Sequence, residues 1–324
     1  MGMKKDFDLT KLLAPVVLVF LYVFFSLVGK NFFSTDYLVN ILDGSYFIGF
    51  IAIGVTFVII TAGIDLSLGT NMMAAALIGG WAFNVLHWPM AWSLILVVAV
   101  GAGLGLVNGI MVAYLKLPPF IATMGMMMTG MGLGAIITNV QTMRYPTFGS
   151  EDAWFKTLFY KTEGGFPLGA LWLAAFFVVA WVLLNKTRFG RYTYAIGSNP
   201  EAARLSGINT KPWLTAVYVF CGLCSGLAGV FYAAVYTSII PSTGNGLELL
   251  GIAGAVIGGT SLMGGMGSLV GTMIGVFIMS VLKQGLMSMG LQGHWQTFFT
   301  GIVIILAVLL DQYRISRSNK VKKA

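Results

Sequence analysis

The sequence predicts an all-α membrane protein of about ten transmembrane helices with short loops, since a helix needs roughly 20 mostly apolar residues to cross a bilayer and about ten such stretches follow one another. Composition supports this fold class: hydrophobic residues make up 57% of the 324 residues and charged residues 9%. Soluble domains have roughly 45–50% apolar and 25% charged residues. The chain therefore has too little charge to cover a soluble surface, and we expect one membrane domain and no soluble one.

The basic residues divide unequally between alternate loops, which supports the same topology. If the N-terminus is cytoplasmic, the cytoplasmic side receives Lys4, Lys5, Lys11, Lys116, Lys186, Arg188, Arg191, Arg204, Lys211, Arg314, Arg317, Lys320, Lys322 and Lys323. The opposite side receives Lys30, Arg144, Lys156, Lys161 and Lys283, some of them in a long external loop at 141–165. Cytoplasmic loops favour Lys and Arg. We therefore expect a multi-pass protein of the inner-membrane type with both termini cytoplasmic, and the net charge of +8 does not indicate nucleic acid.

The membrane domain is predicted to cover residues 12–311, between a cytoplasmic N-terminus at 1–11 and a basic cytoplasmic tail at 312–324. The first apolar stretch is long for a signal peptide and lacks a cleavage site before Lys30, so we interpret it as a retained helix. The expected spans are 12–29, 46–62, 66–86, 91–115, 119–140, 166–185, 212–236, 247–260, 268–283 and 295–311.

A polar break at 63–69 separates the second and third spans and carries the carboxylate of Asp65 at the membrane boundary. Charged groups in such places are costly and often functional. Three roles stay open. Asp65 or Ser67 caps the following helix by accepting hydrogen bonds from its free N–H groups, or Asp65 lies beside a substrate path, or it couples transport to protons. Because 46–86 and 247–283 share the plan of helix, glycine-bearing break and helix, we also expect an internal repeat.

Glycines spaced every four residues predict close contact between spans, since they let helix backbones approach each other in lipid. These rows are Gly101, Gly105 and Gly109; Gly130 and Gly134; Gly222 and Gly226; and Gly271 and Gly275. The methionine run at 124–131 is interpreted as adaptable packing and not as a metal path. Cys221 and Cys224 are too few for a zinc site or a disulfide framework, so we expect them to be packing residues.

The basic cytoplasmic loop at 186–211 contains the start and stop signals of a short helix. Asn199 or Ser198 would cap it, Pro200 would open it, and Gly207 would end it. A helix of two turns does not stand alone in water, so it must rest on lipid, on its own protein or on a partner. The expected helix comprises Asn199, Pro200, Glu201, Ala202, Ala203, Arg204, Leu205 and Ser206.

The glycine-dense segment 252–275 is similar to a phosphate-binding loop only superficially. It has no Gly-Lys-Ser or Gly-Lys-Thr, and no other stretch of the chain matches a nucleotide-binding pattern. We therefore expect no catalytic residue, no metal and no cofactor in this chain. Any ATP-driven mechanism needs a separate subunit that binds ATP and Mg²⁺.

Three segments together resemble the permease subunits of bacterial ABC importers for simple sugars, the ribose and galactose permease family. They are Gly-Ile-Asp-Leu-Ser-Leu-Gly at 63–69, the stretch from Ala195 to Asn209, and Val-Ile-Gly-Gly-Thr-Ser-Leu-Met-Gly-Gly-Met-Gly-Ser at 256–268. The match also includes Thr-Arg-Phe-Gly at 187–190, and it keeps its order and spacing over roughly 40–312.

The resemblance implies a permease in the lipid membrane that works as a homodimer or beside a second, different permease copy. Its helix at 199–206 would seat in a groove of a cytoplasmic ATP-binding-cassette ATPase. A periplasmic or surface sugar-binding protein would deliver a monosaccharide to the outer face. ATP binding would draw the two ATPases together, and the coupling helices would pass this closure to the spans.

Candidates for the sugar path are polar and aromatic side chains near the breaks, since aromatic rings stack on sugar C–H surfaces and hydroxyl or amide groups exchange hydrogen bonds with sugar hydroxyls. They are Asp65, Ser67, Asn71, Phe120, Thr123, Thr260 and Ser261. Capping or bonding between helices explains each of them equally well. The alternative function is an ion-coupled secondary transporter that uses Asp65, with Glu248 as a second carboxylate. A membrane-embedded enzyme is a weaker alternative, because no nucleophile–base pair or metal-ligand spacing occurs in the spans.

Overall fold

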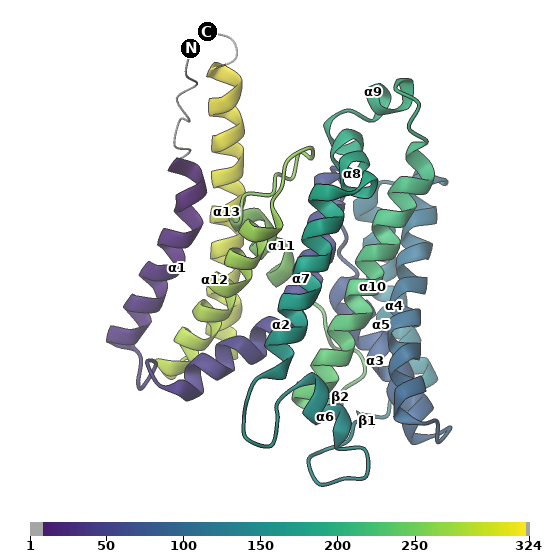
Figure 1. The fold of residues 1–324 in the computed structure, drawn as a ribbon, viewed down its shortest axis with the longest axis vertical. Coiled ribbons are helices and arrows are strands. Elements are labelled where there is room, and N and C mark those ends of the chain that lie inside the picture. The colour runs from purple at the N-terminus through teal and green to yellow at the C-terminus, as the bar shows by residue number, and fades with distance from the viewer. Residues whose placement is uncertain (1–8, 322–324) are drawn as a thin grey trace.

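The long helices run side by side along one axis of the molecule (Figure 1), as a computed structural model shows for residues 9–321. Every predicted span corresponds to a helix, and the all-α membrane fold is confirmed. These helices are α1 (Leu9–Val28), α2 (Thr35–Ile60), α3 (Leu68–Asn84), α4 (Met90–Ala113), α5 (Pro119–Ile137), α7 (Leu168–Lys186), α10 (Thr210–Tyr236), α11 (Leu247–Ile257), α12 (Leu269–Ser288) and α13 (Gly293–Val321). Six of them, α2, α4, α5, α7, α10 and α12, are long and apolar enough to cross a membrane.

Short elements occupy the two long loops at opposite ends of the bundle. The loop that contains 186–211 forms α8 (Arg188–Ser198) and α9 (Pro200–Leu205), which lie at the same end as the start of α1 (Figure 1). The other end carries α6 (Trp154–Phe159) and an antiparallel pair, β1 (Met143–Arg144) with β2 (Ser238–Ile239). Of these, only α9 was predicted from the sequence.

The terminal segments differ in part from the prediction. Helix α13 continues to Val321, so most of the predicted tail at 312–324 is helical. Residues 1–8 of the predicted N-terminal segment and residues 322–324 of the tail lie outside the described residues.

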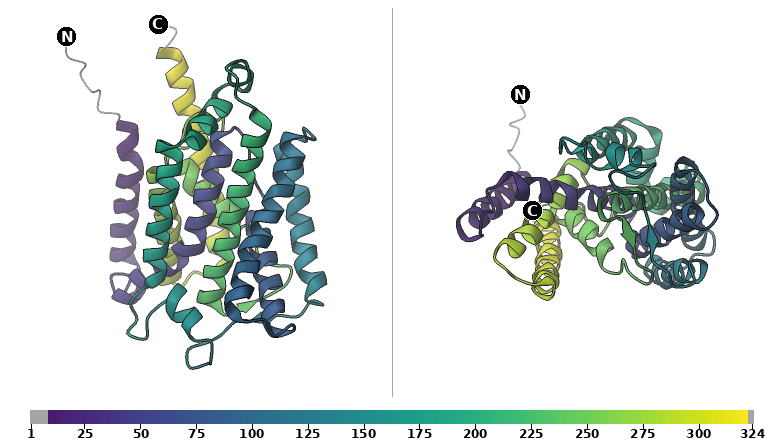
Figure 2. Two further views of the ribbon diagram at one scale, coloured as in Figure 1. Left: turned by 45° about the vertical axis from the view of Figure 1, so that its right-hand side comes forward. Right: turned by 90° about the horizontal axis from the view of Figure 1, so that it is seen from below.

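Helix α2 lies at the centre of the bundle, with α7, α10, α11 and α12 packed around it (Figure 2). It is buried from Ser45 to Ile60, which explains why its sequence is apolar on all sides. Two pairs of hydroxyl groups join it to α12: Ser45 with Ser280 at 2.9 Å and Thr56 with Thr272 at 2.9 Å. The pairs satisfy the buried hydroxyls of Ser280 and Thr272, while Ser45 and Thr56 also bond to carbonyls of their own helix.

The glycine rows predicted from the sequence lie where helices come into close contact. A Cβ atom built on Gly101 of α4 would lie 2.6 Å from the backbone nitrogen of Gly226 on α10. Gly130 and Gly134 of α5 lie against Asn71 and Ala74 of α3, and Gly271 and Gly275 of α12 lie against Gly258 and Gly254. The predicted packing role of Cys221 and Cys224 also holds, since both are buried and free.

Among the helices that correspond to predicted spans, α3 and α11 are short. Helix α11 has 11 residues, which at 1.5 Å per residue gives about 16 Å, roughly half the hydrocarbon thickness of a bilayer. Helix α3 has 17 residues. Their first turns meet, since a Cβ atom on Gly69 would contact Gly244 and would lie 2.5 Å from a carboxylate oxygen of Glu248. Transporters often build their midplane sites from such discontinuous helices.

The irregular segments at 61–67 and 258–267 meet at the end of the bundle that carries α8. The backbone N–H of Gly265 donates a hydrogen bond to the carbonyl of Ile60 at 2.8 Å. The predicted likeness of 46–86 and 247–283 holds in plan only, because both consist of helix, break and helix, while α2 has 26 residues and α11 has 11.

Candidate functional site

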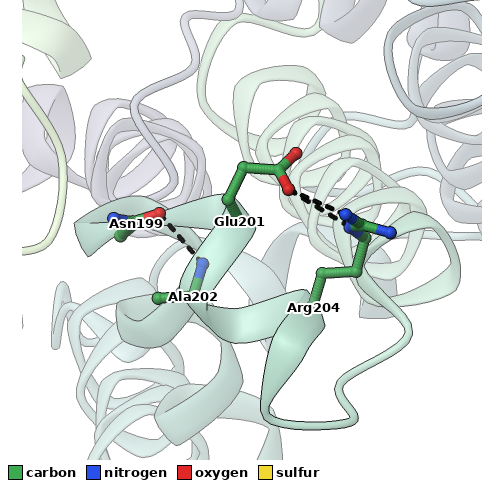
Figure 3. Close-up of polar contacts among 4 residues, drawn as sticks. All are labelled: Asn199, Glu201, Ala202 and Arg204. Atoms are coloured by element: carbon green, nitrogen blue, oxygen red, sulfur yellow. Dashed lines mark hydrogen bonds and ion pairs between the residues drawn. The ribbon is translucent and has the colours of Figure 1, made fainter.

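The short helix α9 stands at one end of the molecule and is capped as predicted (Figure 3). The side-chain carbonyl of Asn199 accepts a hydrogen bond from the Ala202 backbone N–H at 3.0 Å. Pro200 occupies the first turn, where its missing N–H costs nothing. Gly207 follows in the left-handed conformation, with φ of +84°, and ends the segment.

Most of the surface of α9 is exposed. Glu201 and Arg204 form an ion pair, Oε2 to Nη2 at 3.0 Å, in which both side chains stay largely in water. Such a pair contributes only about 0–1 kcal/mol of stability. Leu205 is 81% exposed, whereas Ala203 is buried. The helix thus presents an exposed apolar side chain beside an ion pair, a surface suited to a protein groove.

Helix α9 is held by α8, which the sequence prediction missed. The hydroxyl of Thr187 accepts a hydrogen bond from the Phe189 N–H at 3.1 Å and caps the start of α8. One face of α8 is buried at Gly190, Thr193, Ile196 and Gly197. This face packs against α2, α7 and α10. The helix is therefore fixed to the spans, and α9 extends from it.

Asp65 is fully buried in the break between α2 and α3, and it organises that break. Its Oδ1 accepts hydrogen bonds from the backbone N–H of Ser67 at 2.9 Å and from the Ser67 hydroxyl at 2.6 Å. Asn108 of α4 donates to Oδ2 at 3.3 Å. The Ser67 hydroxyl also accepts from Asn71 at 2.8 Å and from Asn108 at 2.9 Å. These four side chains form one network.

The predicted capping by Ser67 is wrong in detail. Ser67 precedes α3, but its side chain accepts no hydrogen bond from the helix backbone. Its hydroxyl is committed to Asp65 and the two asparagines, because a buried carboxylate gains more from hydroxyl donors than a helix end gains from a cap. Asp65 itself bonds to the backbone two residues ahead, in the way that Asx turns do.

Three residues of distant helices complete this region, and the sequence analysis did not select them. Asn108 lies on α4, and Tyr218 and Ser225 lie on α10. The hydroxyl of Ser225 donates to the Leu68 carbonyl at 2.8 Å, and that of Tyr218 to the Ile64 carbonyl at 3.5 Å. A signal existed for Asn108, a solitary amide near the end of an apolar span.

The remaining path candidates lie in two other places. Thr123 on α5 is buried and donates to the Pro119 carbonyl at 2.8 Å and to the Ile64 carbonyl at 3.4 Å, so it touches the break near Asp65. Phe120, one turn earlier, is 49% exposed. The structure therefore brings Thr123 together with the Asp65 network and leaves Phe120 on the surface of α5.

Thr260 and Ser261 lie in the second break, at 258–267, and both are buried. The hydroxyl oxygen of Ser261 accepts a hydrogen bond from the Met263 N–H at 3.3 Å. The hydroxyl of Thr260 has no hydrogen-bond partner within residues 9–321. This pair belongs to the region under α8, separate from the Asp65 network.

The opposite end of the bundle is tied down by an ion pair. Lys161 Nζ lies 2.8 Å from Asp43 Oδ2, and the Tyr160 hydroxyl donates to the same oxygen at 3.0 Å. Burial by itself lowers the pKa of Lys161, but the hydrogen bonds and charges of Asp43 and Tyr160 outweigh it and raise that pKa above its ordinary value. Lys161 therefore stays charged at neutral pH and fixes the 141–165 loop to α2.

Comparison with protein families matches residues 37–308 to the family described as branched-chain amino acid transport system / permease component. The chain belongs to this family. Within the described residues, no group of three or more His, Cys, Asp or Glu side chains could hold a metal ion.

This permease is similar to curated import permeases over nearly its whole length. It is 39% identical over 305 residues to the ribose import permease protein RbsC of Escherichia coli, covering 91% of this chain and 92% of that protein. It is 35% identical over 301 residues to the fructose import permease protein FrcC of Rhizobium meliloti, covering 92% and 84%. It is 34% identical over 324 residues to the galactose/methyl galactoside import permease protein MglC of Escherichia coli, covering 94% of each.

The comparison with solved structures finds no match. The resemblance predicted from the three motifs is confirmed, and relatives named for sugars stand beside a family description that names branched-chain amino acids.

Proposed function

We propose that this permease is the membrane-spanning subunit of an ATP-binding-cassette importer that moves a monosaccharide into the cytoplasm, while a separate subunit binds and hydrolyses ATP. Relatives named for ribose, fructose and galactose at 34–39% identity support a monosaccharide over an amino acid. An import system of this kind works with an ATPase and with a binding protein that delivers the sugar.

The observation that carries the proposal is α9, a capped and exposed helix at the basic end of the bundle. In this function α9 is the coupling helix, formed by Asn199 to Ser206, and it seats in a groove of the ATPase. Leu205 would fill an apolar pocket, and the charges of Glu201 and Arg204 would set the orientation. Charged groups at the rim of an interface mainly provide specificity.

The test exchanges the two charges of α9. Glu201→Lys combined with Arg204→Glu keeps an ion pair on the helix but presents the opposite charges to the ATPase. We expect membrane insertion to be intact, co-purification of the ATPase in mild detergent to be lost, and uptake to be abolished. Glu163→Lys, an exposed change at the opposite end, should leave co-purification unchanged. Normal uptake by the double variant would remove the coupling role of α9.

For the sugar path, we propose that the exposed face of α5 takes part. Phe120, Met124 and Met128 repeat at helical spacing and are all exposed. An aromatic ring with two flexible thioethers offers an adaptable surface for sugar C–H groups. Asp65, Ser67 and Asn71 are buried, and Ser67 bonds to both of the others, which supports a role in shaping the break beside Thr123. Thr260 and Ser261 would play the corresponding part in the other break.

The same face of α5 supports a second permease copy, identical or paired. Gly125 has open space around it, and Thr129 beside it is exposed. Small and polar residues favour contact between helices over contact with lipid tails. We propose that two copies enclose the path between them, in the bacterial cytoplasmic membrane, with both termini and α9 in the cytoplasm.

The ion-coupled alternative depends on Asp65. Such coupling needs a carboxylate that exchanges protons or ions with the path. Both oxygens of Asp65 accept hydrogen bonds within a buried network, an arrangement that favours a structural role.

A further inference from the structure

The end of α8 packs directly against both glycine-bearing breaks. This contact, here named the α8 junction, is formed by Tyr194 and Gly197 of α8, Ile60 at the end of α2, and Gly265 and Gly267 of the break at 258–267. A Cβ atom on Gly197 would overlap the Ile60 carbonyl and would lie 2.8 Å from the Gly265 nitrogen. Three backbones therefore meet at Gly197 with no side chain between them.

Hydrogen bonds hold the α8 junction together. The Gly265 N–H donates to the Ile60 carbonyl at 2.8 Å, which joins the two breaks to each other. The Tyr194 hydroxyl donates to the Gly267 carbonyl at 2.8 Å, which joins α8 to the break at 258–267. A Cβ atom on Gly264 would lie 2.8 Å from the Ala62 nitrogen and 2.9 Å from the Gly197 carbonyl. The same close packing therefore continues into the first break.

From the α8 junction, each break leads to a different set of spans. The first break leads to Ile64, whose carbonyl accepts hydrogen bonds from Thr123 on α5 and Tyr218 on α10. The second break leads to α12 through Ser268, whose hydroxyl caps that helix by accepting from the Gly271 N–H. A displacement of α8 therefore has a direct mechanical route to both α5 and α12.

We infer that the α8 junction carries the movement of α9 into the membrane, with Tyr194 and Gly197 as positioning residues of the transport cycle. Protein interiors are densely packed, so they transmit strain with little absorption, and backbone contacts without side chains have the least freedom to absorb it. Helix α8 then moves both breaks as one unit. The inference rests on the proposed function of α9 and adds the residues through which α9 acts.

Spin labels on either side of the α8 junction test the inference in the full complex with the ATPase. Arg191→Cys on α8 and Met263→Cys in the second break are both exposed positions, and Glu163→Cys provides a reference at the opposite end. Cys221 and Cys224 are buried and should not react. A non-hydrolysable ATP analogue should change the distance between the labels at 163 and 263, and this change is called the shift. It should leave the distance between 191 and 263 unchanged.

Two substitutions should interrupt the transmission of movement through the α8 junction. Gly197→Ala separates α8 from Ile60, and Tyr194→Phe removes the hydrogen bond to Gly267. We expect each to leave the ATPase bound and to reduce the fraction of shifted complexes about five-fold or more, the lower end of coupling between linked sites. Tyr192→Phe is the matched control, because its hydroxyl forms no hydrogen bond among the described residues of the chain. The shift should persist in that control.

The inference is overturned if labels 191 and 263 separate in the unsubstituted permease, or if the shift survives in Tyr194→Phe and in any folded Gly197→Ala protein. Tyr194→Phe carries the test alone if Gly197→Ala does not fold. If the ATPase binds through Glu201 and Arg204 but neither Gly197→Ala nor Tyr194→Phe affects the shift, only the inferred role of the α8 junction fails. If the ATPase does not associate with the unsubstituted permease at all, the proposed function fails with it.

Discussion

Asp65 shows how this permease keeps a carboxylate among its membrane helices. Moving an unpaired charge away from water costs far more than a protein can recover elsewhere. Three donors compensate for this cost here: the Ser67 hydroxyl, the Ser67 backbone N–H and the Asn108 amide. Two of these donors lie in the break itself and one lies on α4. Asp65 therefore ties the start of α3 to a neighbouring helix.

Two substitutions of Asp65 separate a structural role from proton coupling. Asp65→Asn keeps an acceptor oxygen, so we expect uptake to persist. Asp65→Leu leaves Ser67 and Asn108 without their partner and should lower the free energy of unfolding by about 1–3 kcal/mol, the usual cost of unsatisfied buried groups. Uptake assays and thermal unfolding in detergent measure both effects. Loss of uptake in a stable Asp65→Asn protein would favour the ion-coupled alternative.

The Asp65 network was partly predictable from the sequence. Asp65, Ser67 and Asn71 lie within seven positions of each other, at spacings that bring side chains together at a helix start. Asn108 is a detectable polar residue in an apolar span, but its partner lies 43 positions away. A single sequence contains no signal for that pairing, because the pairing depends on how α4 packs against the break.

At the scale of helices, the contact between α4 and α10 is the largest in the bundle. Gly101 and Gly105 of α4 face Gly222 and Gly226 of α10, with backbone atoms in direct contact. In lipid, where no hydrophobic effect drives helices together, such close packing provides much of the association energy. This contact also brings Tyr218 and Asn108 to the break that holds Asp65.

A methyl group added at this contact should separate the two helices. A Cβ atom on Gly222 would lie 2.7 Å from the Gly105 Cα, so we expect Gly222→Ala to destabilise the protein by about 1–3 kcal/mol through overpacking. Thermal denaturation followed by size-exclusion chromatography measures the loss. Gly103→Ala on α4 meets open space and should be neutral. Equal stability of both variants would contradict the packing described here.

Helix α8 was missed for a physical reason. Its sequence, from Arg188 to Ser198, is too polar to resemble a span, and its two glycines weaken a helix prediction. Tertiary contacts decide its structure, because Gly190 and Gly197 are the positions where it touches the backbones of Leu184 and Ile60. The signals for α9 were local caps, and these were sufficient to predict it.

For the molecule as a whole, the charge asymmetry and the fold agree on two distinct ends. The Lys211 amine lies over the ring of Tyr114 at 5.6 Å, so the loops after α4 and before α10 are neighbours at the α9 end. Arg144 and Lys161 lie at the other end with β1 and the Asp43 ion pair. Because cytoplasmic loops favour basic residues, we propose that the α9 end faces the cytoplasm.

Single cysteines test this orientation in intact cells. Glu151→Cys in the 141–165 loop should react with a membrane-impermeant maleimide added outside, whereas Arg191→Cys on α8, an exposed position outside α9, should react only after the cells are opened. The two native thiols are buried and should contribute no background. Labelling of Arg191→Cys from outside would reverse the proposed topology.

The brevity of α11 has a consequence for how the chain enters the membrane during synthesis. The eleven residues of α11, which include Glu248, are too few to be retained in the bilayer alone, since stable spanning takes roughly 20 mostly apolar residues. Helix α12 meets the condition and contacts α11 along glycines on both helices. We therefore expect the two to insert as one hairpin, with α11 held outside the lipid until α12 has emerged from the ribosome. The half-helix that meets α3 is thus among the last parts of the permease to assemble.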